Sequence, residues 1–130
     1  MGEVSHLRVL VVHDEVLVAD LVRDALEDAG FTVTLAATGA EALTELAEGE
    51  GAIVGLVTDI NLGSGPSGWV VATAARERDA AVAIVYVTGD SAHEWSAHGV
   101  PNSIVVTKPF APSQIVVALS SLLNRAGSDG

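Results

Sequence analysis

Residues 7–15, Leu-Arg-Val-Leu-Val-Val-His-Asp-Glu, join a largely apolar run to three polar residues. Such a run is typical of a strand that is covered on both faces, which is the pattern of parallel sheets. Four further runs of this kind follow along the chain, and helical patterns lie between them. The sequence therefore predicts an α/β fold, a (βα)5 doubly wound sheet whose five parallel strands lie at 7–12, 32–36, 53–58, 82–87 and 103–107.

The helical patterns have recognisable ends. The first is an apolar stripe that stops before Gly30, a residue typical of the position after a helix. Its members are Val18, Leu21, Val22, Ala25, Leu26 and Ala29. Capping signals predict the starts of the other four helices; they are Thr38 with Glu41, Ser67, Ser91 with Glu94, and Pro112. We expect one domain over residues 1–127 and a short polar tail at 128–130.

The composition narrows the class of protein. The 130 residues include 17 Asp and Glu against 6 Lys and Arg, for a net charge of −11, and 49% are hydrophobic. This apolar fraction excludes a disordered chain, and the acidic charge argues against direct binding to nucleic acid. The absence of cysteine removes disulfides and fits a cytoplasmic location. We expect no signal peptide and no membrane insertion, because no apolar run approaches the roughly 20 residues of a membrane span.

Polar side chains follow four of the predicted strands. Parallel strands end at the same edge of a sheet, and ligands bind beyond their carboxyl ends. Two carboxylates, an amide, a hydroxyl and the single lysine of the chain are therefore expected to meet at one edge. They belong to Asp14, Asp59, Asn61, Thr88 and Lys108.

This combination of groups is suited to phosphoryl transfer. The carboxylates of Asp14 and Asp59, with a backbone carbonyl near Asn61, are hard oxygen ligands for Mg²⁺. Asp59 can then act as the nucleophile that forms an aspartyl phosphate. Lys108 can pair with one phosphoryl oxygen, and the Thr88 hydroxyl can donate a hydrogen bond to another.

Four short motifs, taken in their order and spacing, resemble the receiver domain of bacterial two-component response regulators. They are Val9–Glu15, Thr58–Leu62 with Gly68 beyond it, Val87–Gly89 and Thr107–Phe110. The resemblance covers residues 7–125 and implies a flavodoxin-like receiver fold. It implies that Asp59 is the phosphoacceptor, and that Asp14 and Asn61 bind the metal, Asn61 through its carbonyl. Thr88 is then the switch hydroxyl and Lys108 the cation that binds the phosphoryl group, with a cis bond to Pro109.

The leading interpretation is a stand-alone, single-domain response regulator. By the resemblance, it accepts a phosphoryl group from a histidine kinase or a histidine phosphotransfer protein in a Mg²⁺-dependent reaction, with Mn²⁺ as the alternative metal. It signals through contact with a downstream protein. It is not an enzyme in the usual sense, since it catalyses only its own phosphorylation and dephosphorylation.

The chain departs from the receiver pattern at three places. His13 stands where receivers usually carry the first of two acidic residues, and imidazole is a poorer partner for Mg²⁺ than carboxylate. We expect His13 to lie just outside the metal ligands or to bridge through water, with direct ligation as the alternative. The loop 63–68 is one residue longer than usual and lacks the proline that usually follows the leucine. Val105 stands where a switch Tyr or Phe is usual, which leaves Tyr86 or Trp95 as substitutes.

Each site residue also has an ordinary structural interpretation. Asp59 can serve in a turn, Thr88 can end a strand, Asp14 can cap the next helix, and Lys108 can be a solvated lysine. We favour the chemical interpretation, because these residues lie at the ends of four different strands and their chemistry agrees.

Three alternative functions remain. His13 and Val105 favour a pseudo-receiver, a docking or phosphate-sink module with impaired metal binding or switching. A phosphoaspartyl hydrolase of the haloacid dehalogenase type needs an Asp-x-Asp pair after the first strand, whereas Asp59-Ile60-Asn61 follows the third. A flavodoxin-like cofactor site is the least favoured, because the polar residues after the first strand would repel a flavin phosphate.

Overall fold

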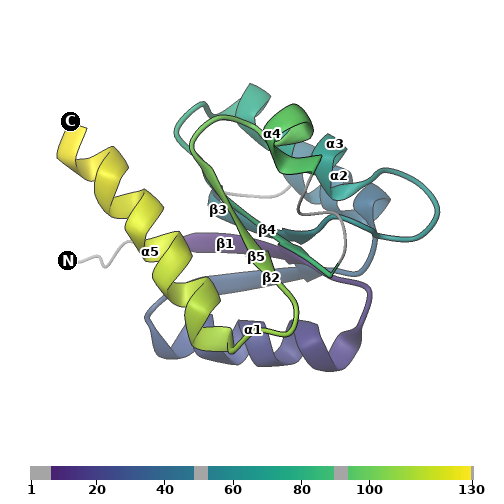
Figure 1. Cartoon of the computed structure of the whole chain (residues 1–130), viewed down its shortest axis with the longest axis horizontal. Helices are drawn as coiled ribbons and strands as arrows, with labels where there is room; N and C mark the ends of the chain where they lie inside the picture. Colours follow the sequence, from purple (N-terminus) through teal and green to yellow (C-terminus); the bar gives the residue numbers. More distant parts are fainter. Residues whose placement is uncertain (1–6, 49–52, 90–93, 130) are drawn as a thin grey trace.

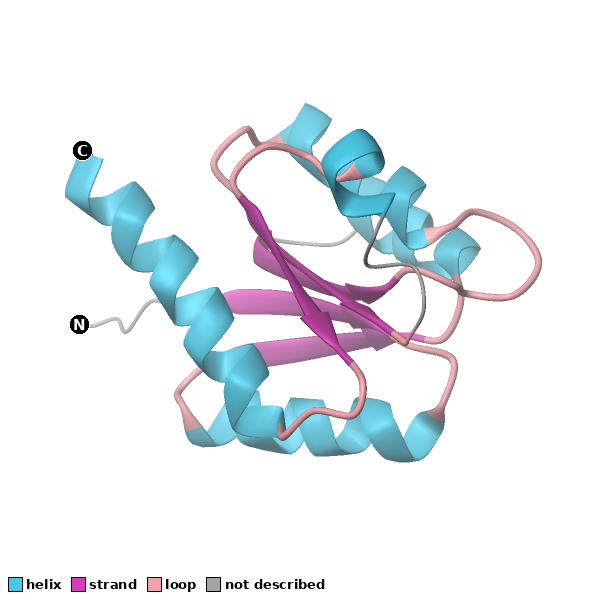
Figure 2. Ribbon diagram, viewed as in Figure 1, coloured by secondary structure: helices cyan, strands magenta, loops and turns pink. Residues whose placement is uncertain are grey.

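Five parallel strands form one sheet at the centre of the molecule (Figure 2). The computed structural model describes residues 7–48, 53–89 and 94–129. The strand order is β2-β1-β3-β4-β5, so that strand order reverses between β1 and β3. The bounds are β1 (Arg8–Val12), β2 (Thr32–Ala36), β3 (Ile53–Asp59), β4 (Ala83–Thr88) and β5 (Ser103–Thr107). Each strand lies within one residue of its predicted range, and the predicted fold class is confirmed.

Helices cover both faces of this sheet (Figure 1). Helices α1 and α5 pack on one face, and α2, α3 and α4 lie on the other. The bounds are α1 (Val16–Asp28), α2 (Gly39–Glu48), α3 (Gly68–Arg78), α4 (Trp95–His98) and α5 (Pro112–Asp129). In the part of the chain that the structure describes, no helix has both the length and the apolar character that a membrane span needs.

The two faces of the sheet bury separate halves of the core. Along β1, Val9 and Val11 pack with α1 and α5, whereas Leu10 and Val12 pack with α2 and α3. All four side chains are at most 1% exposed, because successive residues of a strand point to opposite faces. This two-sided burial explains why β1 is apolar from Val9 to Val12. On one side β1 pairs with β3, the strand that ends in Asp59.

Three of the predicted helix starts are confirmed. The Thr38 hydroxyl accepts a hydrogen bond from the Glu41 N–H (3.0 Å), and the Glu41 carboxylate accepts one from a backbone N–H before the helix. The Ser67 hydroxyl accepts a backbone hydrogen bond at the start of α3, and Pro112 is the first residue of α5. The predicted cap at Ser91 lies outside the described residues.

One detail of the predicted helices is wrong. Leu21 belongs to the predicted apolar stripe of α1, yet it is 57% exposed, because the buried face of this helix is narrower than the stripe. Helix α5 continues through residues 128 and 129 to Asp129, and the domain bound expected at residue 127 stays a prediction. A glycine costs a helix only about 1 kcal/mol, which is too little for Gly127 to end it.

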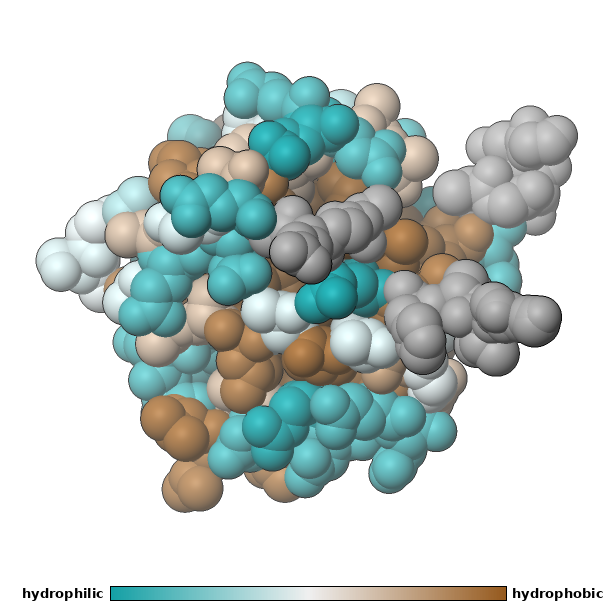
Figure 3. Space-filling view, turned by 180° about the vertical axis from the view of Figure 1, so that it is seen from behind, coloured by the Kyte–Doolittle hydropathy of each residue, from teal (hydrophilic) through white to brown (hydrophobic). Residues whose placement is uncertain are grey.

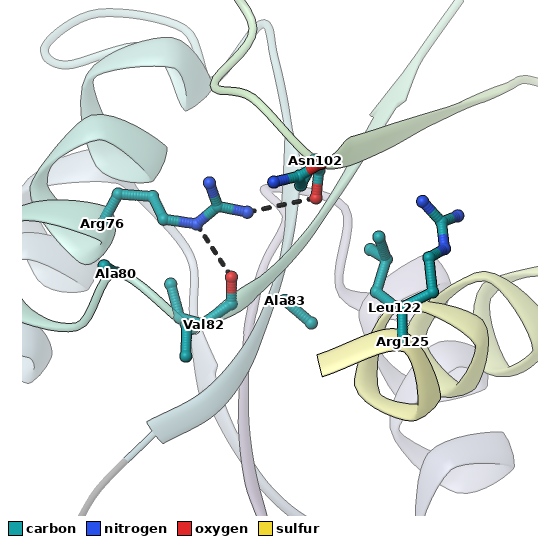
Figure 4. Close-up of a pocket in the computed structure, with 8 residues that line it drawn as sticks. Arg76, Ala80, Val82, Ala83, Asn102, Leu122 and Arg125 are labelled. Carbon is teal, nitrogen blue, oxygen red and sulfur yellow. Dashed lines mark hydrogen bonds between the residues drawn. The ribbon is translucent and has the colours of Figure 1, made fainter. Parts of the chain in front are cut away.

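Arg76 joins the end of α3 to the loops that precede β4 and β5 (Figure 4). Its Nε–H donates to the Val82 carbonyl (2.9 Å), and its Nη2–H donates to the Asn102 carbonyl (3.1 Å). Its Nη1–H donates to the Pro101 carbonyl. These bonds border a cavity of about 330 Å³ that Arg125 also lines. Arg76 is thus a cross-link at the amino ends of β4 and β5.

Candidate functional site

The carboxyl ends of four strands bring the predicted site residues to one edge of the sheet. Asp59 ends β3 and Thr88 ends β4, while Asp14 and Lys108 follow β1 and β5 within two residues. The parallel register keeps these ends level, because the neighbouring strands pair up to their last residues. Strand order reverses at this edge between β1 and β3, which is where open α/β sheets bind their ligands.

Asp59 lies at the centre of this edge, and its side chain is only 5% exposed. Its Oδ2 accepts a hydrogen bond from the Lys108 ammonium (3.1 Å), and its Oδ1 accepts one from the Asn61 N–H (3.2 Å). The fold thus joins the predicted nucleophile to the single lysine of the chain, 49 residues away. Donors on both oxygens fix the orientation of the carboxylate, and the charged donor makes the stronger bond.

His13 packs against the same carboxylate. The residue is 5% exposed, and its Nδ1 accepts a hydrogen bond from the Glu15 N–H at the start of α1 (3.1 Å). Its Nε2 lies 3.4 Å from Asp59 Oδ2. The imidazole is therefore held between a helix start and the predicted phosphoacceptor.

Burial lowers the pKa of His13 below 6.5 and is the largest influence on it. The Asp59 carboxylate raises this pKa, the Lys108 ammonium lowers it, and the carboxylates of Asp14 and Glu15 raise it by less. The pKa of His13 is lowered overall, because burial destabilises the charged imidazole by more than these carboxylates stabilise it. His13 is accordingly neutral at pH 7.

His13, Asp14 and Asp59 form a group that suits a divalent cation. Each offers one ligand atom, and the three atoms lie within 4.8 Å of one another. Two carboxylates fit Mg²⁺ or Mn²⁺, which prefer oxygen ligands. His13 adds a nitrogen, which Mg²⁺ does not favour. The residues present therefore fit such a cation through Asp14 and Asp59.

Glu15 is a neighbour of the site to which the sequence analysis assigned no role. Its carboxylate lies 3.9 Å from Lys108 Nζ and 4.0 Å from His13 Nε2, although its side chain is 64% exposed. Glu15 is also the N-cap residue of α1, so the structure does not support Asp14 as its cap. The position of Glu15 directly after Asp14 could have indicated that it lies at the site. Acidic residues are common at the start of a helix, however, so this position alone did not distinguish Glu15.

Asn61 and Thr88 flank Asp59 in the structure. The Asn61 N–H binds the Asp59 carboxylate, and metal binding by the Asn61 carbonyl stays a prediction. Thr88 is fully buried, and its carbonyl accepts a hydrogen bond from the Lys108 N–H (2.8 Å). Its role as a switch hydroxyl also stays a prediction. The bond between Lys108 and Pro109 is cis, as the resemblance implied.

Neither substitute for the missing switch aromatic is free in the structure. Val105 on β5 pairs in register with Tyr86 on β4, and Tyr86 is fully buried. The Tyr86 hydroxyl accepts a hydrogen bond from the Val100 N–H (3.1 Å), and its ring centroid lies 4.8 Å from that of Trp69. Trp95 donates its indole N–H to a serine of β5 (2.9 Å). Both aromatic side chains are therefore fixed by hydrogen bonds in the part of the core under α3 and α4.

An apolar pocket of about 300 Å³ lies beside Lys108, between α1 and the segment after β5. Its lining residues are Val18, Leu21, Lys108, Pro109, Phe110 and Pro112. The start of α1 also exposes Val16 (69%) and Leu17 (78%). In Figure 3, apolar residues interrupt the hydrophilic surface along the lower edge of the molecule. Large contiguous apolar patches on a protein surface are typical of interaction sites.

Comparison with known proteins agrees with this geometry. The family model described as "Response regulator receiver domain" matches residues 9–120, and the chain belongs to this family. The "Aerobic respiration control protein ArcA" of Escherichia coli (strain K12) is 31% identical over 119 residues, which cover 90% of this chain and 48% of that protein. The "Transcriptional regulatory protein ResD" of Bacillus subtilis (strain 168) is 28% identical over 127 residues, covering 97% and 52%. The chain spans about half the length of these curated relatives.

Solved structures show the same fold. A response regulator receiver protein from Sinorhizobium medicae WSM419 is 45% identical, with a TM-score of 0.86 over 92% of this chain and 96% of that one. A CheY-like receiver domain protein from Methanospirillum hungatei JF-1 is 25% identical, with a TM-score of 0.83 over 97% and 100%. The molecule therefore has the receiver fold that its sequence motifs resemble.

Proposed function

We propose that this receiver domain accepts a phosphoryl group on Asp59 and acts as a phosphoacceptor signalling module rather than as a conventional enzyme. The observation that carries the proposal is the 3.1 Å hydrogen bond from Lys108 Nζ to the buried Asp59 Oδ2. This contact supports the proposal because it joins the proposed nucleophile to a cation suited to binding phosphoryl oxygens, at the edge where open α/β sheets bind their ligands.

In the proposed reaction, an Asp59 carboxylate oxygen attacks the phosphorus of a phosphohistidine on a donor protein. The O–P bond forms as the P–N bond breaks, and the donor imidazole leaves with the electron pair, neutral because its other nitrogen carries a proton. Lys108 stabilises the negative charge of the phosphoryl oxygens. The Thr88 hydroxyl supplies a further hydrogen bond to them. The product is an aspartyl phosphate.

A divalent cation would be held by the carboxylates of Asp14 and Asp59, with the Asn61 carbonyl as a third ligand. When bound, Mg²⁺ offsets the negative charge of the carboxylates and of the incoming phosphoryl oxygens. Asp14 is exposed while Asp59 is buried, so the acidic group is open to solvent on one side.

The proposed partners are proteins, namely a histidine kinase or histidine phosphotransfer protein as donor and a downstream protein as target. A donor has to bring its phosphohistidine to Asp59. The apolar pocket beside Lys108, with Val16 and Leu17 on α1, supports docking of a protein at this place. A cytoplasmic location, where such donors act, is part of the same proposal.

Intact-mass measurement after incubation with acetyl phosphate and Mg²⁺ tests the proposed phosphoacceptor. We expect wild type to gain one phosphoryl group, Asp59→Ala to gain none, and the exposed-residue control Asp24→Ala to behave as wild type. Beryllofluoride with Mg²⁺, a mimic of the phosphoryl group, should bind wild type but not Asp59→Ala. Incorporation that survives Asp59→Ala would contradict the assignment.

A pseudo-receiver is the second candidate, and the buried His13 in the site is the observation that favours it. In that case the domain docks to its partners without efficient metal binding. Mg²⁺ titration at neutral pH separates the two: no measurable affinity in wild type, restored by His13→Asp, supports the pseudo-receiver.

A further inference from the structure

The hydrogen bond at His13 Nδ1 identifies which ring nitrogen carries the proton. Nδ1 accepts from the Glu15 N–H, so it has no hydrogen of its own. In the neutral imidazole the proton is then on Nε2. Nε2 is the ring nitrogen that faces Asp59, 3.4 Å from Oδ2.

The Nε2–H is buried and lacks a hydrogen-bond partner among the described residues. Buried polar groups normally have partners, and each exception calls for an explanation. The nearby Asp59 Oδ2 already accepts from Lys108, and the imidazole is not aligned for a second bond to it. The site therefore holds an unpaired donor close to the carboxylate of the proposed phosphoacceptor.

We propose that the His13 Nε2–H donates a hydrogen bond to the phosphoryl group on Asp59, and that this donor reduces the dependence of phosphorylation on a divalent cation. The inference rests on the proposed function. A preorganised donor stabilises negative charge as it arrives, without reorganisation. An acidic residue at position 13 would repel the phosphoryl oxygens, and a bound metal would have to offset that repulsion. A neutral donor at this position removes the repulsion.

The chemical step with acetyl phosphate is balanced without proton transfer. The bond from an Asp59 oxygen to phosphorus forms, the bond from phosphorus to the acetyl oxygen breaks, and acetate leaves with the electron pair. His13 keeps its proton throughout, as a hydrogen-bond donor rather than as an acid. Direct metal ligation by Nε2 is a competing role, but it would require the proton on Nδ1 and so the loss of the bond from Glu15.

The first measurement reads the tautomer in the wild-type protein. NMR of isotope-labelled histidine follows both ring nitrogens of His13, which are assigned by their absence in His13→Leu. We expect the proton on Nε2 in the metal-free protein, and a downfield shift of this proton when beryllofluoride and Mg²⁺ bind. A proton on Nδ1, or no response of Nε2–H to beryllofluoride, would overturn the proposal.

The second measurement is the metal dependence of phosphorylation, taken as the rate with saturating Mg²⁺ divided by the rate in EDTA. We expect this ratio to rise at least about tenfold in His13→Asp, and the rate in EDTA to fall about tenfold in His13→Leu, the effect of one charge-assisted hydrogen bond. The exposed-residue control His98→Gln should match wild type. Equal ratios in all four proteins would overturn the proposal.

The controls separate this proposal from the proposed function. Phosphorylation of wild type at Asp59 with unchanged metal dependence in the His13 variants defeats only the His13 proposal. No uptake by wild type at any Mg²⁺ concentration defeats both. Thermal melting by circular dichroism shows whether each variant is folded, and the tautomer measurement needs only the wild-type fold.

Discussion

Replacing Gly68 with alanine should destabilise the protein, although alanine is the better helix former. Gly68 is the first residue of α3 and is buried against the end of β3, which carries the proposed phosphoacceptor Asp59. A Cβ at this position would lie 2.2 Å from the Asp59 carbonyl oxygen and 2.8 Å from the Ile60 Cα. Ordinary van der Waals contact begins at about 3.4 Å, so either α3 or the end of β3 must move by about 1 Å.

Two opposing effects determine the size of the change. The helix propensity of alanine stabilises the variant by at most about 1 kcal/mol, and by less at the first position of a helix. Overpacking against backbone costs about 1–3 kcal/mol or more. The displacement also weakens the hydrogen bond from the Gly68 N–H to the Ile60 carbonyl (2.9 Å), worth about 1 kcal/mol. We expect a net loss of about 2 kcal/mol in the free energy of unfolding.

Urea unfolding of wild type, Gly68→Ala and Gly89→Ala measures this effect. Gly89 is a matched control at the same edge of the sheet, because among the described residues its Cβ would meet only a Lys108 methylene, at 4.0 Å. We expect Gly68→Ala to lower the urea midpoint by roughly 1 M and Gly89→Ala to stay within about 0.5 kcal/mol of wild type. A Gly68→Ala protein as stable as wild type would refute the close approach of α3 to Asp59.

Two further predictions concern residues outside the site. Burial raises the pKa of Tyr86 above 10.0 in the folded protein. The unfolded state therefore loses the phenol proton at a lower pH than the folded state. The free energy of unfolding should fall as the pH rises from about 10 through the folded-state pKa of Tyr86. Because Tyr86 is the single tyrosine, the tyrosinate absorbance of the folded protein tests this directly, and a midpoint at or below 10.0 would contradict it. Arg76→Met should lower the free energy of unfolding in urea by about 2 kcal/mol, because it leaves three carbonyl groups without their donor. The exposed control Arg78→Met should stay within about 0.5 kcal/mol of wild type. Equal losses in the two variants would contradict the cross-link.

Local patterns predicted the strands and most helix starts, because these depend on neighbours in the sequence. Burial on both faces demands apolar residues at successive positions, and this demand is visible in residues 7–12 without any structure. The capping box of Thr38 and Glu41 closes within one turn, so its hydrogen bonds were also predictable. The residue at which α5 ends was not predictable, because Gly127 destabilises a helix only weakly and its effect depends on the rest of the helix.

The site was predictable in part for a different reason. Parallel strands end at a common edge, so Asp59 and Lys108 were expected to meet although 49 residues separate them. Their 3.1 Å contact agrees with this expectation. The exposure of Leu21 beside the pocket was not foreseen, because periodicity shows which residues share a helix face but not how much of that face the sheet covers.

The sequence by itself determined the chemistry at the sheet edge: which carboxylates, hydroxyl and lysine follow which strands, and that an imidazole replaces an acidic residue at position 13. Only the tertiary structure decided which atoms surround that imidazole. Its tautomer depends on the start of α1, which supplies the N–H for Nδ1, and its direction depends on β3, which places Asp59 before Nε2. Hydrogen-bond direction is a property of atoms in space, and no pattern of residue types along the chain contains it.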